Sequence, residues 1–178
     1  MHRTQKLAIT ALMASLALAF SVLKLEAPYP MLPYLKFDLA EIPVTTLYFL
    51  CGISWSLVAE TLHFVGLLAR GADPLGAMMK YLAVVSMLVG TWLTGKVLRK
   101  NIIAQATGGA MLRIFVMLAA NWAYFSFLYP NLLSYAVKQA GGVFLLYLYT
   151  SLFNLIHAGI SLGISWILYA EINKRIKL

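Results

Sequence analysis

Long apolar runs, separated by short polar or basic segments, dominate the pattern of this chain. The first run, residues 7–23, follows the basic residues Arg3 and Lys6. It is longer than the apolar core of about 7–15 residues that is typical of a signal peptide, so we expect a retained transmembrane helix. Hydrophobic runs of similar character predict further helices at about residues 41–52, 54–69, 76–95, 108–129 and 143–170.

Residues 24–40 interrupt this pattern. Three prolines stand close together there: Pro28, Pro30 and Pro33. A helix interior cannot hold them, because each proline removes a backbone donor and clashes with the preceding turn. The segment is rich in aromatic residues and poor in Gly and Ser, so we expect an ordered loop rather than a flexible linker.

The stretch 41–69 decides the topology. As one helix its 29 residues would extend about 43 Å at about 1.5 Å per residue. The hydrocarbon core of a bilayer is only about 30 Å thick. A turn near Gly52 would instead give two short crossings and place all three basic clusters on one side, as the positive-inside rule requires. We therefore predict six transmembrane helices, the 24–40 loop outside, and both termini in the cytoplasm.

Composition supports an integral membrane protein of one domain, residues 1–178. Of the 178 residues 62% are hydrophobic and 11% are charged, and the mean hydropathy is +0.82. Soluble domains carry about 25% charged residues, so a soluble enzyme or a disordered chain is excluded. The net charge of +8 lies in clusters between the apolar runs, so it does not indicate nucleic-acid binding. Cys51 is the single cysteine, which excludes an internal disulfide or a CxxC site.

Two sequence features suggest catalysis. Glu60 and His63 lie one turn apart on one face of a predicted helix, where they could form a catalytic pair or a buried hydrogen bond between helices. Gly159 to Gly163 reads G-x-S-x-G, but a serine nucleophile needs a strand, a sharp turn and a helix around it. Inside a long apolar helix, the same glycines favour close helix packing. We expect no metal site and no cofactor.

Ala11, Ser15 and Ala19 recur every four residues and form one stripe on the first helix. Small residues let helices approach closely, either within the bundle or against another membrane protein.

A few polar residues stand near the expected outer ends of the later helices: Lys80, Asn121, Asn154 and His157. A solute site needs a few oriented polar groups among apolar and aromatic walls, and Tyr124 is one aromatic residue in the right place. Such residues are also common in a membrane-interface belt, which is the plainer interpretation for any single aromatic.

Four segments resemble a known family in the right order. Residues 30–43, PMLPYLKFDLAEIP, look like the first outer loop of the riboflavin-specific S components of energy-coupling factor (ECF) transporters. Residues 71–76 (GADPLG), 121–130 (NWAYFSFLYP) and 153–156 (FNLI) resemble three further segments of that family. The chain departs from the family at Lys80, where an Asn is usual, and at His157, where a Lys is usual.

The resemblance implies an all-α bundle of six transmembrane helices in the plasma membrane that captures a vitamin at its outer face. In the family the S component docks on a membrane coupling subunit that two ATPases drive, and it binds no ATP itself. The implied docking surface is Ala11 and Ser15. The implied solute site is formed by Leu32, Tyr34, Leu35, Lys80, Asn121, Tyr124, Asn154 and His157.

Riboflavin would then be the transported substrate. Lys80 leaves open an anionic solute, such as a phosphorylated flavin. Two other classes of protein also stay open: an intramembrane enzyme that uses Glu60 and His63, and a structural membrane subunit without a ligand.

Overall fold

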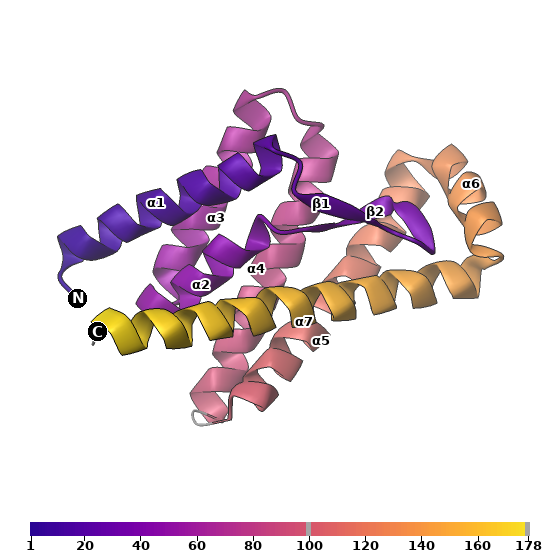
Figure 1. Ribbon diagram of the computed structural model, residues 1–178. Coiled ribbons are helices and arrows are strands. Elements are labelled where there is room, and N and C mark those ends of the chain that lie inside the picture. The colour runs from indigo at the N-terminus through magenta and orange to yellow at the C-terminus, as the bar shows by residue number, and fades with distance from the viewer. Residues whose placement is uncertain (99–100, 177–178) are drawn as a thin grey trace.

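The computed structural model describes residues 1–98 and 101–176. In this part of the chain, seven α-helices, one π-helix and a two-stranded sheet follow one another (Figure 1). In chain order they are α1 (Arg3–Val22), β1 (Glu26–Tyr29), β2 (Leu32–Asp38), α2 (Glu41–Cys51), α3 (Ile53–Ala69), α4 (Pro74–Val97), α5 (Ile102–Ala123), the π-helix η1 (Tyr124–Leu128), α6 (Pro130–Ala140) and α7 (Val143–Ile176).

Gly52 separates two short helices, at the point where the charge argument places a turn. It ends α2 and begins α3 with φ 89° and ψ 175°, a conformation that favours glycine. The 11 residues of α2 extend only about 16 Å, about half of the hydrocarbon thickness. Helix α2 therefore cannot cross a membrane alone.

Four described segments are long and apolar enough to cross a membrane: Arg3–Val22, Pro74–Val97, Ile102–Leu128 and Val143–Arg175. The part of the chain that the structure describes thus has seven α-helices and four long apolar spans, and the expected count of six crossing helices is not confirmed. The six-helix prediction counted α2 as a full crossing and did not include α6.

The segment expected to be a loop contains a β-hairpin. Strands β1 and β2 pair antiparallel, with Glu26 opposite Asp38 and Tyr29 opposite Leu32. Proline lacks a backbone donor, but it is tolerated on edge strands, and both strands of a two-stranded sheet are edges. The prolines exclude a helix without excluding a strand, so the all-α prediction is wrong for this segment.

Helix α6 lies between the predicted helices 108–129 and 143–170, in a polar segment for which the apolar pattern predicts no helix. Pro130 occupies its first turn, and Gly141 ends it in a left-handed conformation with φ 85°. This arrangement of an N-terminal proline and a C-terminal glycine is typical of helices. Its polar residues lie on the outside, whereas Ala136 and Ala140 are buried against the hairpin and α7. The segment is an amphipathic helix, so its polar composition alone was misleading.

Close helix packing occurs between α4 and α5. A Cβ atom at Gly90 would lie 2.5 Å from the carbonyl oxygen of Gly108, so only glycine fits there. By contrast, nothing lies within 4 Å of a Cβ built at Gly159 or Gly163. The prediction that these two glycines mediate close packing is therefore wrong within the described chain. Glycine spacing alone did not identify which of the helix faces is covered.

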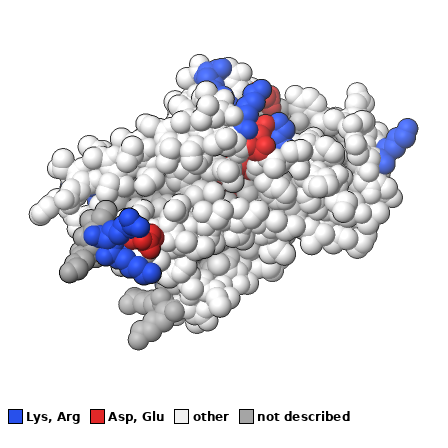
Figure 2. All heavy atoms as spheres, viewed as in Figure 1, with Lys and Arg blue, Asp and Glu red and all other residues white. Residues whose placement is uncertain are grey.

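The surface fits a membrane environment. Figure 2 shows charged atoms gathered at the margins of one face, with a broad uncharged expanse between them. Large apolar side chains are exposed on the long helices, among them Val97, Ile103 and Phe144. Figure 1 places the start of α1 near the last turns of α7, and residues of both segments line one surface hollow.

Candidate solute site beneath the hairpin

Two adjoining cavities lie beneath β2, among α4, α5 and α7. Their volumes are about 280 and 320 Å³. They share a common wall that includes Tyr34, Leu35, Met79, Met117 and Phe153. Solute pockets generally measure about 300–1,000 Å³, so the two together have room for a small molecule. One cavity, called the ionic cavity below, has several charged side chains in its wall, and the other, the apolar cavity, is lined mainly by apolar and aromatic side chains.

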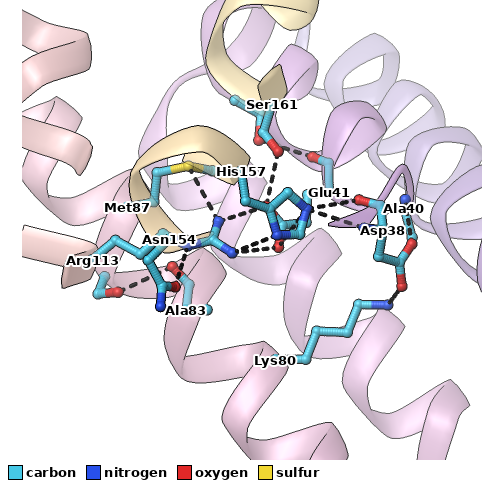
Figure 3. Close-up of polar contacts among 12 residues, drawn as sticks. Asp38, Ala40, Glu41, Lys80, Ala83, Met87, Arg113, Asn154, His157 and Ser161 are labelled. Atoms are coloured by element: carbon cyan, nitrogen blue, oxygen red, sulfur yellow. Dashed lines mark hydrogen bonds and ion pairs between the residues drawn. The ribbon is translucent and has the colours of Figure 1, made fainter. Parts of the chain in front are cut away.

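An ion pair forms the floor of the ionic cavity (Figure 3). Arg113 in α5 meets Glu41 at the start of α2 in a two-point contact, with Nη1–Oε2 2.6 Å and Nη2–Oε1 2.9 Å. Both residues are about 1% exposed. Arg113 Nε also donates to Asn154 Oδ1 at 3.1 Å, and Ser161 donates to Glu41 at 2.9 Å. A buried charge is tolerated when it is paired and hydrogen-bonded in this way.

His157 connects this floor to the hairpin. Its Nδ1 lies 3.0 Å from Arg113 Nη2, which can only donate, so Nδ1 accepts. In the neutral ring the proton is then on Nε2, which donates to the carbonyl oxygen of Asp38 at 3.1 Å. The end of β2 is thereby held to α7.

Lys80 in α4 forms an ion pair with Asp38 at the end of β2. A second ion pair, Lys36 with Glu26, joins the two strands at the edge of the same cavity. The charges in the cavity wall are therefore matched in pairs. Because the positive charge of Lys80 is already paired, it gives little support to an anionic solute.

The apolar cavity has a few polar groups. Asn121 is 7% exposed and donates to the carbonyl oxygen of Met117 at 2.8 Å, while its own amide oxygen has no partner among the described residues. That oxygen can accept a hydrogen bond from a solute. Partial burial raises the pKa of Tyr34 to about 12, so its hydroxyl stays protonated. Tyr124 and Phe125 contribute aromatic walls.

Seven of the eight expected solute-site residues line one or both cavities: Tyr34, Leu35, Lys80, Asn121, Tyr124, Asn154 and His157. Leu32 is the exception. It is fully buried between Tyr29 and Phe125 in the cluster that joins the hairpin to α6, and it lines neither cavity. Leu32 stands at the start of β2, next to the turn of the hairpin, where it packs in this cluster instead of facing the cavities.

The other predicted groups lie away from the cavities. Ala11 and Ser15 are exposed on α1, so they are not packed within the bundle. Glu60 and His63 are each 1% exposed and lie 3.3 Å apart, Oε2 to Nδ1. Neither residue lines the two cavities. The described residues contain no cluster of three His, Cys, Asp or Glu that could hold a metal ion.

Three charged residues line the ionic cavity but are not among the residues that the sequence predicts for the site: Arg113, Glu41 and Asp38. Arg113 did carry a signal, since it is a charged residue inside a predicted membrane-spanning run and such residues usually face the interior. Glu41 and Asp38 stand at the boundary between a loop and an apolar run, where charged residues are common. Nothing in their spacing predicts that they meet residues more than 40 positions away.

Comparison with solved structures identifies the architecture. A structure described as the S component of a bacterial ECF transporter matches this chain with a TM-score of 0.78 and 19% sequence identity. The match covers 99% of this chain and 100% of the other. No protein-family model and no curated protein sequence matches the chain. The protein therefore has the fold of an ECF S component, a multi-pass membrane architecture.

Proposed function

We propose that this protein is the substrate-capture subunit of an ECF-type importer and not an enzyme. The observation that carries the proposal is the pair of cavities beneath the hairpin, in a chain with the S-component fold. A cavity with apolar walls and a few oriented polar groups suits reversible binding of a small solute. The Glu60–His63 pair lines neither cavity, which argues against the enzyme alternative.

Riboflavin is the solute that we propose. A flavin ring is flat and aromatic, so it needs apolar faces and a few hydrogen bonds at its edge. The apolar cavity offers Leu35, Tyr124 and Phe153 as walls and Asn121 as a polar contact. The polar ribityl chain would reach Asn154 and the paired charges of the ionic cavity. The sequence resemblance to riboflavin-specific S components supports the same choice.

The complete transporter would contain a membrane coupling subunit and two ATPases as partners. We propose that the exposed small residues Ala11 and Ser15 form the surface of α1 that meets the coupling subunit, because they let another helix approach closely. The basic clusters near the two chain ends favour a plasma-membrane orientation with both termini in the cytoplasm.

The test is a visible absorbance spectrum of the detergent-purified protein, followed by calorimetric titration with riboflavin. A flavin spectrum, or saturable binding of one riboflavin per chain, is the expected result. A colourless protein that ignores riboflavin but binds another vitamin would overturn the proposed substrate while keeping the capture role. A protein that binds no member of a vitamin panel would contradict the capture role itself.

A further inference from the structure

A chain of polar side chains leads from the ionic cavity into the contact between α1 and α3. Lys80 Nζ, in the cavity wall, donates to Ser21 Oγ of α1 at 3.0 Å. Ser21 Oγ lies 3.0 Å from His63 Nε2, and His63 Nδ1 lies 3.3 Å from Glu60 Oε2. Ser21, His63 and Glu60 are all buried and line neither cavity.

The direction of each hydrogen bond follows from the donors available. An ammonium group can only donate, so the Ser21 oxygen accepts from Lys80 and its own proton is free for His63. A neutral imidazole that accepts at Nε2 carries its proton on Nδ1, which then donates to the Glu60 carboxylate. The hydrogen bonds therefore all run in one direction, from Lys80 through Ser21 and His63 to Glu60.

We propose that Ser21, His63 and Glu60 are positioning residues that fix the ammonium of Lys80 at the wall of the solute cavity. Two groups then hold the ammonium: Asp38 of the hairpin from one side and Ser21 of α1 from the other. Without Ser21, the flexible lysine side chain has one anchor fewer and samples more positions. Hydrogen bonds to a charged group are among the stronger ones in proteins.

The order Ser–His–Glu is also that of a hydrolase triad, but the surroundings favour positioning. A nucleophilic serine needs an open approach for its substrate. Ser21 is 7% exposed, and its oxygen already accepts from Lys80. Apolar side chains would fill this buried space at lower cost, since polar groups inside a membrane segment are expensive. The presence of Ser21, His63 and Glu60 in this buried position is therefore explained by the need to hold Lys80.

The chain also joins the cavity to α1. Ser21 lies on α1, the helix whose exposed face carries Ala11 and Ser15. Because Lys80 donates a hydrogen bond to Ser21, a movement of Lys80 on solute binding would act directly on α1. This consequence rests on the proposed function. The positioning of Lys80 does not, and it is tested without any solute.

The test is the reactivity of the Lys80 amine in the full chain in detergent. The protein is treated briefly with acetic anhydride, and acetylation of Lys80 is measured by peptide mass spectrometry relative to the exposed Lys138. Ser21→Ala should raise the relative reactivity about tenfold, the equivalent of one hydrogen bond to a charged group. Ser21→Thr keeps the hydroxyl and should stay within about twofold of the wild type. His63→Ala should raise reactivity by a smaller factor, because Ser21 loses its second partner.

Thr61→Ala is the matched control on α3. Thr61 is exposed, and its hydroxyl lies within hydrogen-bond distance of Tyr81 and not of Ser21, His63 or Glu60. It should leave Lys80 reactivity unchanged. Unchanged reactivity in Ser21→Ala, or an equal rise in Ser21→Thr, would overturn the proposal. If Ser21→Ala does not fold, His63→Ala decides the matter by the same readout.

A double-mutant cycle with riboflavin tests the link to binding. Ser21→Ala should weaken riboflavin binding several-fold in the wild-type background and have no effect in a Lys80→Met background, because its action passes through Lys80. Equal losses in both backgrounds would contradict that link. If the wild type does not bind riboflavin, the proposed substrate fails, while the acetylation result still decides the positioning role.

Discussion

The guanidinium of Arg113 and the carboxylate of Glu41 meet in the centre of the protein, with Nη1–Oε2 2.6 Å and Nη2–Oε1 2.9 Å. The two residues are 72 positions apart and join α5 to the start of α2. The same pair also forms the floor of the ionic cavity. One contact therefore serves both the fold and the proposed site.

Breaking this pair should destabilise the protein strongly. Arg113→Met leaves Glu41 buried without its cation, and loss of one partner of a buried ion pair generally costs about 3–5 kcal/mol. Thermal unfolding in detergent, followed by fluorescence, measures the loss. The double variant Arg113→Met with Glu41→Gln should recover much of the stability, because no unpaired charge remains.

The exposed pair Arg175–Glu171 is the matched control. Its side chains are 77% and 51% exposed, so Glu171→Gln should change the unfolding temperature very little. A loss in Glu171→Gln equal to that in Arg113→Met would contradict the importance given to the buried pair.

Glycine substitutions should separate the covered helix face from the open one. Gly90→Ala forces a methyl group against the backbone of α5, and such overpacking generally costs about 1–3 kcal/mol. Gly163→Ala meets nothing within 4 Å and should be neutral or slightly stabilising, since alanine favours helix. Unfolding temperatures of the two variants test this directly. Equal losses would mean that α4 and α5 do not pack as described.

The ion pair Lys80–Asp38 should disfavour an anionic solute. Because the charge of Lys80 is paired, flavin mononucleotide should bind no more tightly than riboflavin. Asp38→Asn removes the partner and should improve the relative affinity for the phosphorylated flavin by about tenfold, the equivalent of roughly 1.4 kcal/mol of charge interaction. Calorimetric titration of both ligands measures the ratio. A wild type that prefers the phosphorylated flavin would revive the anionic alternative.

The face formed by Ala11 and Ser15 should matter for transport and not for capture. Ala11→Trp adds a bulky side chain to the exposed side of α1, which prevents close approach of a partner helix. We expect riboflavin affinity within about twofold of the wild type and loss of uptake in cells that contain the coupling subunit and ATPases. Leu12→Trp, at an exposed position one residue on, is the control. Normal uptake by Ala11→Trp would rule out this face as the docking surface.

The sequence predicts well those parts of the structure that depend on neighbouring residues alone. The turn at Gly52 follows from length and charge, which depend only on neighbouring residues and on the bilayer. The resemblance in residues 30–43 also leads to the segment that covers the cavities. The burial of Leu32 depends on contacts between the hairpin and α6, which are distant in the sequence and are not predicted by the local pattern.

The long-range polar contacts could not be predicted from spacing. Asp38 with Lys80, Glu41 with Arg113 and Ser21 with His63 each connect residues more than 40 positions apart. Their meeting depends on the crossing of helices, which a single sequence does not specify. The lone Arg113 in an apolar run showed that a partner must exist, although it did not show which one.

The most direct test of the central claim is to fill the cavity. Met117 is 7% exposed and lines both cavities, so Met117→Trp should place a large ring where the solute is proposed to bind. Met111→Trp makes the same substitution on the same helix at an exposed position. By calorimetric titration, riboflavin binding should be lost in Met117→Trp and retained in Met111→Trp. Wild-type affinity in a folded Met117→Trp protein would contradict the assignment of the solute site.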